Sequence, residues 1–293
     1  MAQRKILVFG ANGQVGRELT TRARGLAVGF DRASVDICVE AEVQQAVRDH
    51  APASIINAAA YTAVDRAETE PDEALRVNRD GAAILAETAA SAGVPIIHLS
   101  TDYVFDGTKG TPYSEDDPVA PLGVYGLSKA EGERAVREIC PRHLILRTAW
   151  VYSPFGTNFV RTMLRLAAKR PELQIVNDQT GCPTAAADIA ATILAVITKA
   201  RQPGFTEWGT YHYRGGDVVT WYAFATLIFE VATRYGQKAP RLVPISTADY
   251  PTPALRPAYS VLAVDKVERV FGIRSRPLSE SLRECLDILL LRS

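Results

Sequence analysis

A short apolar segment followed by three evenly spaced glycines constrains the fold of this chain more than any other part of its sequence. Residues 5–10 read Lys-Ile-Leu-Val-Phe-Gly, an apolar run typical of a strand buried on both faces of a parallel sheet. Gly10 allows a tight turn, Gly13 lets backbone approach a pyrophosphate, and Gly16 lets the following helix pack on the strand. This pattern predicts a dinucleotide-binding turn, with G-x-x-G-x-x-G spacing in place of the commoner G-x-G-x-x-G.

The next predicted strand, residues 26–30, leads to two residues that distinguish cofactors. Asp31 lies about 20 residues past the glycine turn, where an acid that binds the ribose is expected. Arg32 follows at once, and an arginine there pairs with a 2′-phosphate. The sequence therefore leaves NAD and NADP open. Residues 34–38 predict a third edge strand from which Asp36 and Ile37 face an adenine, with a solvated turn as the alternative.

Strands and helices alternate through the first half of the chain. Strands are predicted at 54–60, 94–100 and 143–147, and helices at 41–50 and from Pro71 onward. This alternation predicts an α/β fold with a Rossmann-like, doubly wound parallel sheet.

Two features of this half favour ligand binding. Ala58, Ala59 and Ala60 end one predicted strand, and their small side chains let backbone approach a ligand at the carboxyl edge of the sheet. Asn78 lies inside a predicted helix although asparagine is a poor helix former, so we expect a local hydrogen bond there, with a solvent-facing side chain as the alternative.

The pattern changes after Trp150 and predicts a smaller α/β substrate-binding domain. We expect a dinucleotide-binding domain at 1–150, with part of 174–200 returning to it, and a mainly substrate-binding domain at 151–293. Residues 249–260 contain three prolines and predict an irregular loop of the kind that often binds substrate.

Tyr125 and Lys129 are four residues apart and share one face of a predicted helix. A phenol normally has a pKa of about 10, and an ammonium one turn away favours the phenolate, so we expect a lowered pKa at Tyr125. The pair alone is more often a coincidence of two surface residues. Thr101, at the end of the predicted strand before this helix, supplies the context of a reacting site.

The composition excludes several classes of function. Lys plus Arg (33) equals Asp plus Glu (33), which gives no reason to expect nucleic acid or an anionic membrane as a partner. We expect a cytoplasmic protein with no signal peptide and no membrane span. The cysteines are far apart and lack metal-ligand spacing, which argues against a disulfide scaffold and a zinc site. They are Cys38, Cys140, Cys182 and Cys285.

Together these features resemble the extended short-chain dehydrogenase/reductase superfamily. Over nearly the whole chain the sequence is more closely similar to the family of dTDP-4-dehydrorhamnose reductases. The blocks that carry the resemblance are residues 10–16, 100–107, 121–126, 147–152, 177–184 and 250–257.

The resemblance implies NAD(P)H-dependent reduction of the C4 ketone of dTDP-4-dehydro-L-rhamnose, the last step of dTDP-rhamnose synthesis. NADPH is the expected cofactor and NADH the alternative. The resemblance also implies that Tyr125 is the general acid, that Lys129 stabilises the tyrosinate and binds the nicotinamide ribose, and that Thr101 donates to the ketone oxygen. The expected cofactor contacts are Gly10, Asn12, Gly13, Gln14, Val15, Gly16, Asp31, Arg32, Asp36, Ile37, Ala58, Ala59, Ala60, Asn78, Tyr125 and Lys129.

Further residues are expected to bind the substrate. An indole can lie against the apolar face of a sugar, and an arginine suits a pyrophosphate. For Asp102, a turn-capping role is an equal alternative. The expected substrate contacts are Asp102, Tyr103, Trp150, Asn158 and Arg256.

Other functions are weighed against this one. Tyr103 stands where related nucleotide-sugar dehydratases carry a glutamate, which disfavours dehydration. One alternative is a reductase that acts on another nucleotide-linked 4-keto sugar. The other is a non-catalytic, NADP-binding regulatory subunit, and the intact Thr101, Tyr125 and Lys129 argue against it. Some relatives are dimers with Mg²⁺ between subunits; Glu18 matches one such ligand without convincing equivalents of the others. We therefore expect no metal at the active site and allow a homodimer.

Overall fold

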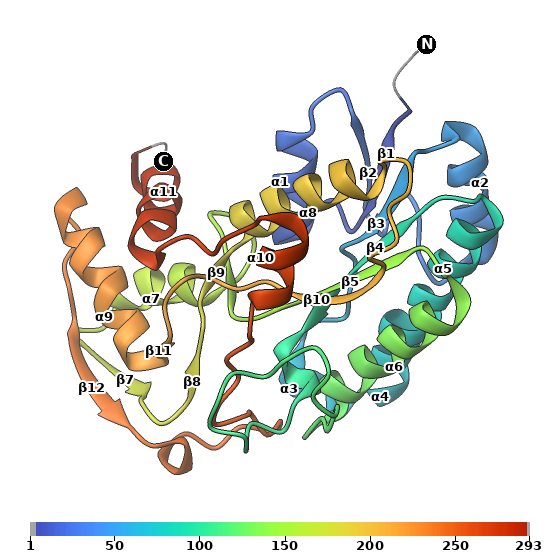
Figure 1. Cartoon of the computed structure of the whole chain (residues 1–293). Helices are drawn as coiled ribbons and strands as arrows, with labels where there is room; N and C mark the ends of the chain where they lie inside the picture. The colour runs from blue at the N-terminus through green and yellow to red at the C-terminus, as the bar shows by residue number, and fades with distance from the viewer. Residues whose placement is uncertain (1–3, 292–293) are drawn as a thin grey trace.

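A six-stranded sheet forms the centre of the larger part of the molecule, on the right in Figure 1. The structure is a computed structural model that describes residues 4–291. Every neighbouring pair of strands in this sheet is parallel. In spatial order the strands are β10 (Gly209–His212), β5 (His143–Thr148), β4 (Ile96–Thr101), β3 (Ser54–Asn57), β1 (Ile6–Phe9) and β2 (Ala27–Phe30).

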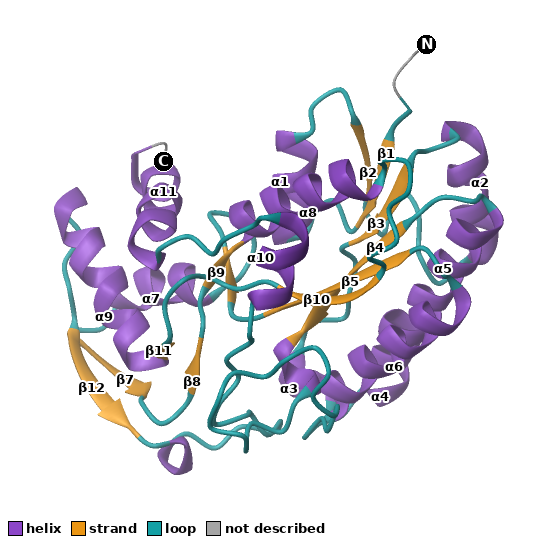
Figure 2. Cartoon of the chain, viewed as in Figure 1, coloured by secondary structure: helices purple, strands orange, loops and turns teal. Residues whose placement is uncertain are grey.

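Helices cover both faces of the sheet, because its strands are apolar on both sides (Figure 2). Leu7 and Phe9 belong to one apolar cluster, and Ile6 and Val8 to the cluster on the opposite face. The first face is covered by α2 (Glu40–His50), α5 (Gly81–Ser91) and α6 (Val124–Ile139). The second is covered by α1 (Gln14–Arg22), α8 (Ala186–Ala200) and α10 (Asp265–Phe271). The predicted doubly wound α/β fold is confirmed.

Short helical segments follow two of the central strands near the predicted site. After β3 come α3 (Val64–Ala67), α4 (Pro71–Leu75) and a π-helical segment (Arg76–Asp80) that runs into α5. A 3-10 turn (Asp102–Val104) follows β4. The predicted long helix from Pro71 thus exists, with a wider turn around Asn78.

The smaller part of the molecule, on the left in Figure 2, packs helices against three two-stranded ladders. The ladders pair β6 (Val151–Tyr152) with β9 (Thr184–Ala185), β7 (Glu172–Val176) with β12 (Arg241–Ile245), and β8 (Thr180–Gly181) with β11 (Val219–Thr220). The helical elements are α7 (Phe159–Ala167), α9 (Trp221–Ala232), α11 (Leu278–Leu291) and the 3-10 turns Thr233–Tyr235 and Thr247–Asp249. Among residues 4–291, no helix combines the length and apolarity that a membrane span requires.

The chain passes between the two parts more than once. Helix α8 packs in the same apolar cluster as α1, and β10 extends the central sheet beside β5. Val267 of α10 belongs to that cluster as well. No local pattern in the sequence predicted β10 or α10, and the residue ranges of the two predicted domains stay a prediction.

The predicted edge strand at 34–38 is wrong. These residues form turns, and β2 is the edge of the sheet. The Asp31 carboxylate accepts hydrogen bonds from the backbone N–H (3.0 Å) and the hydroxyl (2.8 Å) of Ser34, and the Asp36 carboxylate accepts one from Cys38 N–H (2.9 Å). Side chains that bond to nearby backbone in this way compete with a strand ladder.

Candidate functional site

The glycine turn joins β1 to the N-terminus of α1 at the carboxyl edge of the sheet. Gly10 has a φ of +86°, and a Cβ there would lie 2.5 Å from the backbone nitrogen of Ala59. A Cβ on Gly16 would lie 2.1 Å from the carbonyl oxygen of Gly10. Gly13 precedes α1 without a side-chain cap, so the first N–H groups of α1 are free to hold an anion. The turn therefore fits a pyrophosphate.

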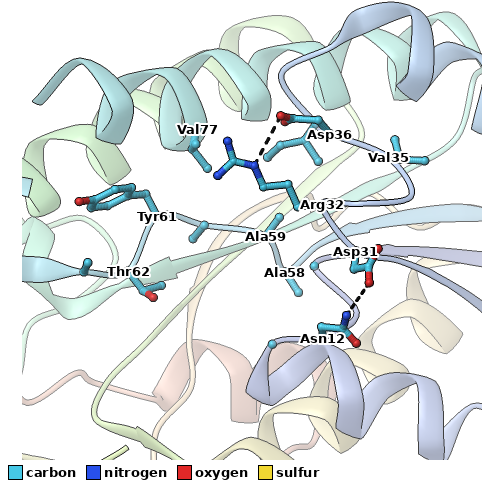
Figure 3. Close-up of a pocket in the computed structure, with 15 residues that line it drawn as sticks. Asn12, Asp31, Arg32, Val35, Asp36, Ala58, Ala59, Tyr61, Thr62 and Val77 are labelled. Carbon is cyan, nitrogen blue, oxygen red and sulfur yellow. Dashed lines mark hydrogen bonds and ion pairs between the residues drawn. The ribbon is translucent and has the colours of Figure 1, made fainter. Parts of the chain in front are cut away.

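A cavity of about 400 Å³ opens beside this turn (Figure 3). Asn12 donates a hydrogen bond to the Asp31 carboxylate (2.5 Å), and Arg32 reaches across to Asp36 (3.6 Å). The small residues after β3 form another wall. Ten of the predicted cofactor residues line the cavity: Gly10, Asn12, Gly13, Asp31, Arg32, Asp36, Ile37, Ala58, Ala59 and Ala60.

Sequence reasoning missed part of this lining. Tyr61, Thr62 and Ala63 directly follow the predicted run of alanines, so their position after β3 was the available signal. Val35 lies beside the adenine-side residues, and Val77 comes from the π-helical segment. No local pattern marks Val77 as a cavity residue.

Six predicted cofactor residues do not line this cavity: Gln14, Val15, Gly16, Asn78, Tyr125 and Lys129. Asn78 is 1% exposed, and its amide is used within the protein. It donates to the Ser128 hydroxyl (2.9 Å) and the Tyr61 carbonyl (3.1 Å), and it accepts from Tyr61 N–H (2.9 Å). Asn78 thus links Tyr61, which lines the cavity, to Ser128 of α6. The hydrogen bond predicted for Asn78 is therefore present.

Gln14 and Asn158, predicted on different ligands, contact each other. Asn158 caps α7 by accepting from Arg161 N–H (3.2 Å), and its amide nitrogen donates to Gln14 Oε1 (2.9 Å). Ser153 also donates to Gln14 Oε1 (2.8 Å). The structure places Asn158 in this contact between the glycine turn and the smaller part of the molecule, outside the lining of the cavity beside the turn.

Thr101, Tyr125 and Lys129 come together where β4 ends and α6 begins. Gly123 precedes α6 without a side-chain cap, and the Glu68 carboxylate from beyond α3 accepts the Val124 N–H (2.9 Å). A negative charge at the N-terminus of α6 interacts favourably with the dipole of that helix. The Lys129 ammonium is 2% exposed and donates to the Leu99 carbonyl (2.7 Å).

The expectation that Lys129 lowers the pKa of Tyr125 is wrong for this structure. Burial raises the pKa of Tyr125 to about 12, against a lowering contribution from a Thr101 hydrogen bond, and the charge of Asp102 raises it further. Burial also lowers the pKa of Lys129 to about 8, against the opposing charge of Glu133. The Lys129 ammonium donates its hydrogen bond to the Leu99 carbonyl, and burial is the largest influence on the pKa of the Tyr125 phenol. At neutral pH Tyr125 is a protonated acid and Lys129 is mostly charged.

Asp102 and Tyr103 complete this cluster. Thr101 donates to the Asp102 carboxylate (3.1 Å) and accepts Tyr103 N–H (3.2 Å), so Thr101 also has the local backbone role of a strand-end threonine. Burial raises the pKa of Asp102 to about 6. The rings of Tyr103 and Tyr125 meet edge to face, with centroids 5.5 Å apart.

A second cavity of about 520 Å³ lies in the smaller part of the molecule. Arg256 lines it and makes a bidentate pair with Asp65 of α3, at 3.0 and 2.9 Å. Burial raises the pKa of Tyr103, and the charge of Arg256 opposes that rise, which indicates that Arg256 lies near the Tyr125 cluster. Tyr250 and Thr252 also line this cavity, and both lie in the loop at 249–260 that the sequence predicts to be of a substrate-binding kind. Residues that sequence reasoning missed here include Phe159, Gln174, Gln179 and Trp221.

Trp150 lies at the crossing between the two parts. Its φ is +46°, a strained conformation for a bulky residue and a frequent mark of a functional position. Its ring stacks on Trp221, with centroids 3.4 Å apart and planes 3° apart, and packs against Gly181. Trp221 in turn lines the second cavity.

Glu18, the residue matched to a possible metal ligand, is ion-paired with Arg22 at 3.2 Å. Within residues 4–291, no group of three or more His, Cys, Asp or Glu side chains is arranged to hold a metal ion.

Comparison with known proteins gives consistent results. The sequence matches the family described as RmlD substrate binding domain over residues 4–291. A dTDP-4-dehydrorhamnose reductase of Sinorhizobium fredii is 47% identical over 292 residues, covering 98% of each chain. The crystal structure of a Clostridium acetobutylicum dTDP-4-dehydrorhamnose reductase matches with a TM-score of 0.91 at 39% identity, covering 97% of this chain and 99% of that one. A Bacillus anthracis dTDP-4-dehydrorhamnose reductase in complex with NADP matches with a TM-score of 0.90 at 35% identity, over 97% and 99%.

Proposed function

The chain belongs to the RmlD substrate-binding-domain family, and on that premise we propose that it is an NADPH-dependent reductase of the C4 ketone of dTDP-4-dehydro-L-rhamnose. The observation that carries this proposal is the cluster of Thr101, Tyr125 and Lys129 at the sheet edge. Its geometry combines a neutral phenol, a hydroxyl and a buried ammonium. That set suits proton delivery to a ketone oxygen.

The glycine turn and the adjacent cavity fit a dinucleotide, whose reduced nicotinamide supplies the hydride when it is bound. Tyr125 donates its proton to the oxygen of the ketone as negative charge develops there. The Thr101 hydroxyl donates a hydrogen bond to the same oxygen and stabilises that charge. The charge of Lys129 then stabilises the tyrosinate that Tyr125 leaves.

We propose that Arg32 gives the preference for NADPH, because a guanidinium pairs well with a 2′-phosphate. Arg32 lines the cavity beside the glycine turn, and its side chain is 71% exposed. Its ion pairs with Asp36 (3.6 Å) and Glu73 (3.5 Å) are at the surface and therefore weak, so the side chain can turn toward a ligand. Arg32→Ala should raise the Kd for NADPH about tenfold and leave that for NADH nearly unchanged.

The measurement is a fluorescence titration with each nucleotide, and Arg48→Ala is the matched control. Arg48 is an exposed arginine of α2 outside the cavity, so its replacement should alter neither Kd. Equal weakening of NADPH and NADH binding in Arg32→Ala would contradict the assignment of Arg32 to the 2′-phosphate.

We propose that the second cavity holds the nucleotide half of the substrate, with Arg256 at its diphosphate. The cavity is lined by aromatic and amide side chains that suit a pyrimidine, including Trp221, Gln179 and Tyr250. Arg256 is held in place by Asp65 and Thr252, and a preformed guanidinium binds phosphate at lower entropic cost.

Arg256→Gln should therefore weaken dTDP binding at least about tenfold and change thymidine binding little. Isothermal titration with the two ligands separates loss of a phosphate contact from general damage to the cavity. Equal losses for dTDP and thymidine would remove Arg256 from the diphosphate site.

The experiment that tests the function is NADPH oxidation on addition of the 4-keto sugar nucleotide. NADPH binding without turnover would favour the alternative of a regulatory subunit. A higher kcat/KM for a GDP-linked 4-keto sugar would favour the alternative of another substrate.

We further propose that the enzyme works in the cytoplasm, where nucleotide sugars and NADPH are made, and that residues 1–150 form the cofactor-binding domain. All four cysteines are free, which suits a reducing compartment. The homodimer stays a prediction.

A further inference from the structure

A buried row of polar side chains runs beneath Lys129 and ends at the cofactor cavity. Asn57 of β3 and His98 of β4 are direct partners in the parallel register. Both project from the sheet face that α6 covers, as do Ile55 and Ile96 two residues earlier. Asn57 is 1% exposed and His98 is fully buried, so their hydrogen bonds must be made within the protein.

The backbone fixes which way the Asn57 amide points. Its Oδ1 accepts a hydrogen bond from Ala59 N–H (3.1 Å), and Ala59 lines the cofactor cavity. Turning the amide over would set two donors against each other at Ala59. The amide nitrogen therefore faces His98 Nδ1, at 3.0 Å. Because that nitrogen can only donate, Nδ1 of His98 must be the acceptor and carries no proton.

The second ring nitrogen of His98 faces Lys129. Burial, with the charges of Lys129 and Arg137, holds the pKa of His98 well below its usual value, so the imidazole is neutral and its one proton is on Nε2. Nε2 lies 3.4 Å from Lys129 Nζ. An Nε2–H group can hydrogen-bond to that nitrogen only when the amine has a lone pair. Lys129 makes its other contact as a donor to the Leu99 carbonyl (2.7 Å).

We propose that Asn57 and His98 are positioning residues that hold the Lys129 amine and favour its uncharged form. They act through Lys129 and do not contact substrate, and this inference rests on the proposed role of Lys129 in ketone reduction. The opposing influence is Glu133, one turn further along α6, whose carboxylate favours the ammonium. Burial and His98 thus act against Glu133 to set the proton affinity of Lys129 near the working pH. Arg137, whose charge also acts on His98, and Tyr125, one turn before Lys129 on α6, are further titratable groups nearby.

The other histidines provide internal controls, because each points Nδ1 at a backbone carbonyl and should carry its proton there. His212 is the matched case, fully buried, with Nδ1 3.1 Å from the Tyr113 carbonyl and Nε2 3.3 Å from an Arg147 nitrogen. His50 and His143 face the Ala46 and Cys140 carbonyls at 2.9 and 2.7 Å.

The decisive experiment is ¹⁵N NMR of the full chain labelled at its four histidines. Long-range correlations between ring protons and nitrogens should show the proton of His98 on Nε2 and that of His212 on Nδ1, and His98→Gln assigns the first signal. A His98 proton on Nδ1 would overturn the proposal. This readout uses the unaltered protein and does not depend on activity, so it stands apart from any failure of the proposed reduction.

Asn57→Asp provides a second, functional test. A carboxylate accepts from both Ala59 N–H and His98 Nδ1–H, which turns the imidazole donor away from Lys129 and favours the ammonium. The alkaline limb of the pH profile of kcat/KM should move up by about one unit. A lower rate at every pH with an unmoved limb would show a merely structural role and contradict the proposal.

Discussion

Replacing Tyr125 with phenylalanine should lower kcat for ketone reduction about 10²–10⁴-fold, the usual contribution of a positioned general acid. Burial raises the pKa of the Tyr125 phenol to about 12, although a hydrogen bond with Thr101 opposes the rise. The phenol therefore keeps its proton until a stronger base forms beside it. An alkoxide forming at the sugar ketone is such a base. The Kd for NADPH should change little, because Tyr125 lies outside the cavity beside the glycine turn, which we propose as the main dinucleotide site.

Tyr235→Phe is the matched control for Tyr125→Phe. Tyr235 also has a hydrogen-bonded phenol, paired with Asp287 in the smaller part of the molecule, away from both cavities. Its replacement should leave kcat unchanged. Near-normal turnover in Tyr125→Phe would place the acid elsewhere.

In the unaltered enzyme, kcat/KM should fall as pH rises through about 8, because Lys129 then loses the charge that stabilises the tyrosinate.

The second large effect concerns stability. Glu133 and Arg147 form a fully buried bidentate pair between α6 and β5, with hydrogen bonds of 2.8 and 2.7 Å. Glu133→Gln should lower the free energy of unfolding by about 3–5 kcal/mol, because it leaves the Arg147 charge buried without its carboxylate. Denaturant titration measures this loss. Glu131→Gln, on the same helix and paired with Arg134 at the surface, should cost less than about 1 kcal/mol.

The pH dependence of this pair has a definite sign. Burial alone would raise the pKa of Glu133, but the hydrogen bonds and charge of Arg147 outweigh burial and hold it below its usual value. Such a carboxylate contributes stability above its unfolded pKa, and that contribution is lost as pH falls through its folded pKa. The difference in stability between the natural protein and Glu133→Gln should therefore shrink in acid. A difference independent of pH would show that the pair does not carry the effect.

Local sequence signals were sufficient for the parts of the site that lie on one segment. The glycine turn, the alanine run after β3, and Tyr125 with Lys129 each sit within a few residues of one another. Residue type and spacing are enough to locate these groups along the chain, although they did not give the correct direction for the pKa of Tyr125. The parallel sheet then gathers them at one edge.

Features that depend on pairing between distant segments could not be predicted in this way. The contact between Asn57 and His98 requires the register of β3 against β4, and the second cavity requires Arg256 to meet Asp65 across the molecule. The turn at 34–38 arose because the side chains of Asp31 and Asp36 bond to backbone there. The raised pKa of Tyr125 depends on burial by surrounding elements, which the spacing to Lys129 does not reveal.

We propose that NADPH bound to this chain gives its hydride to C4 of a dTDP-linked 4-keto sugar while Tyr125 supplies the proton. The most direct test is turnover of dTDP-4-dehydro-L-rhamnose with NADPH deuterated at the transferred position, followed by NMR of the product. We expect dTDP-L-rhamnose with deuterium at C4, and no such product from Tyr125→Phe in the same period. Cofactor binding without product, or a product with no deuterium at C4, would contradict it.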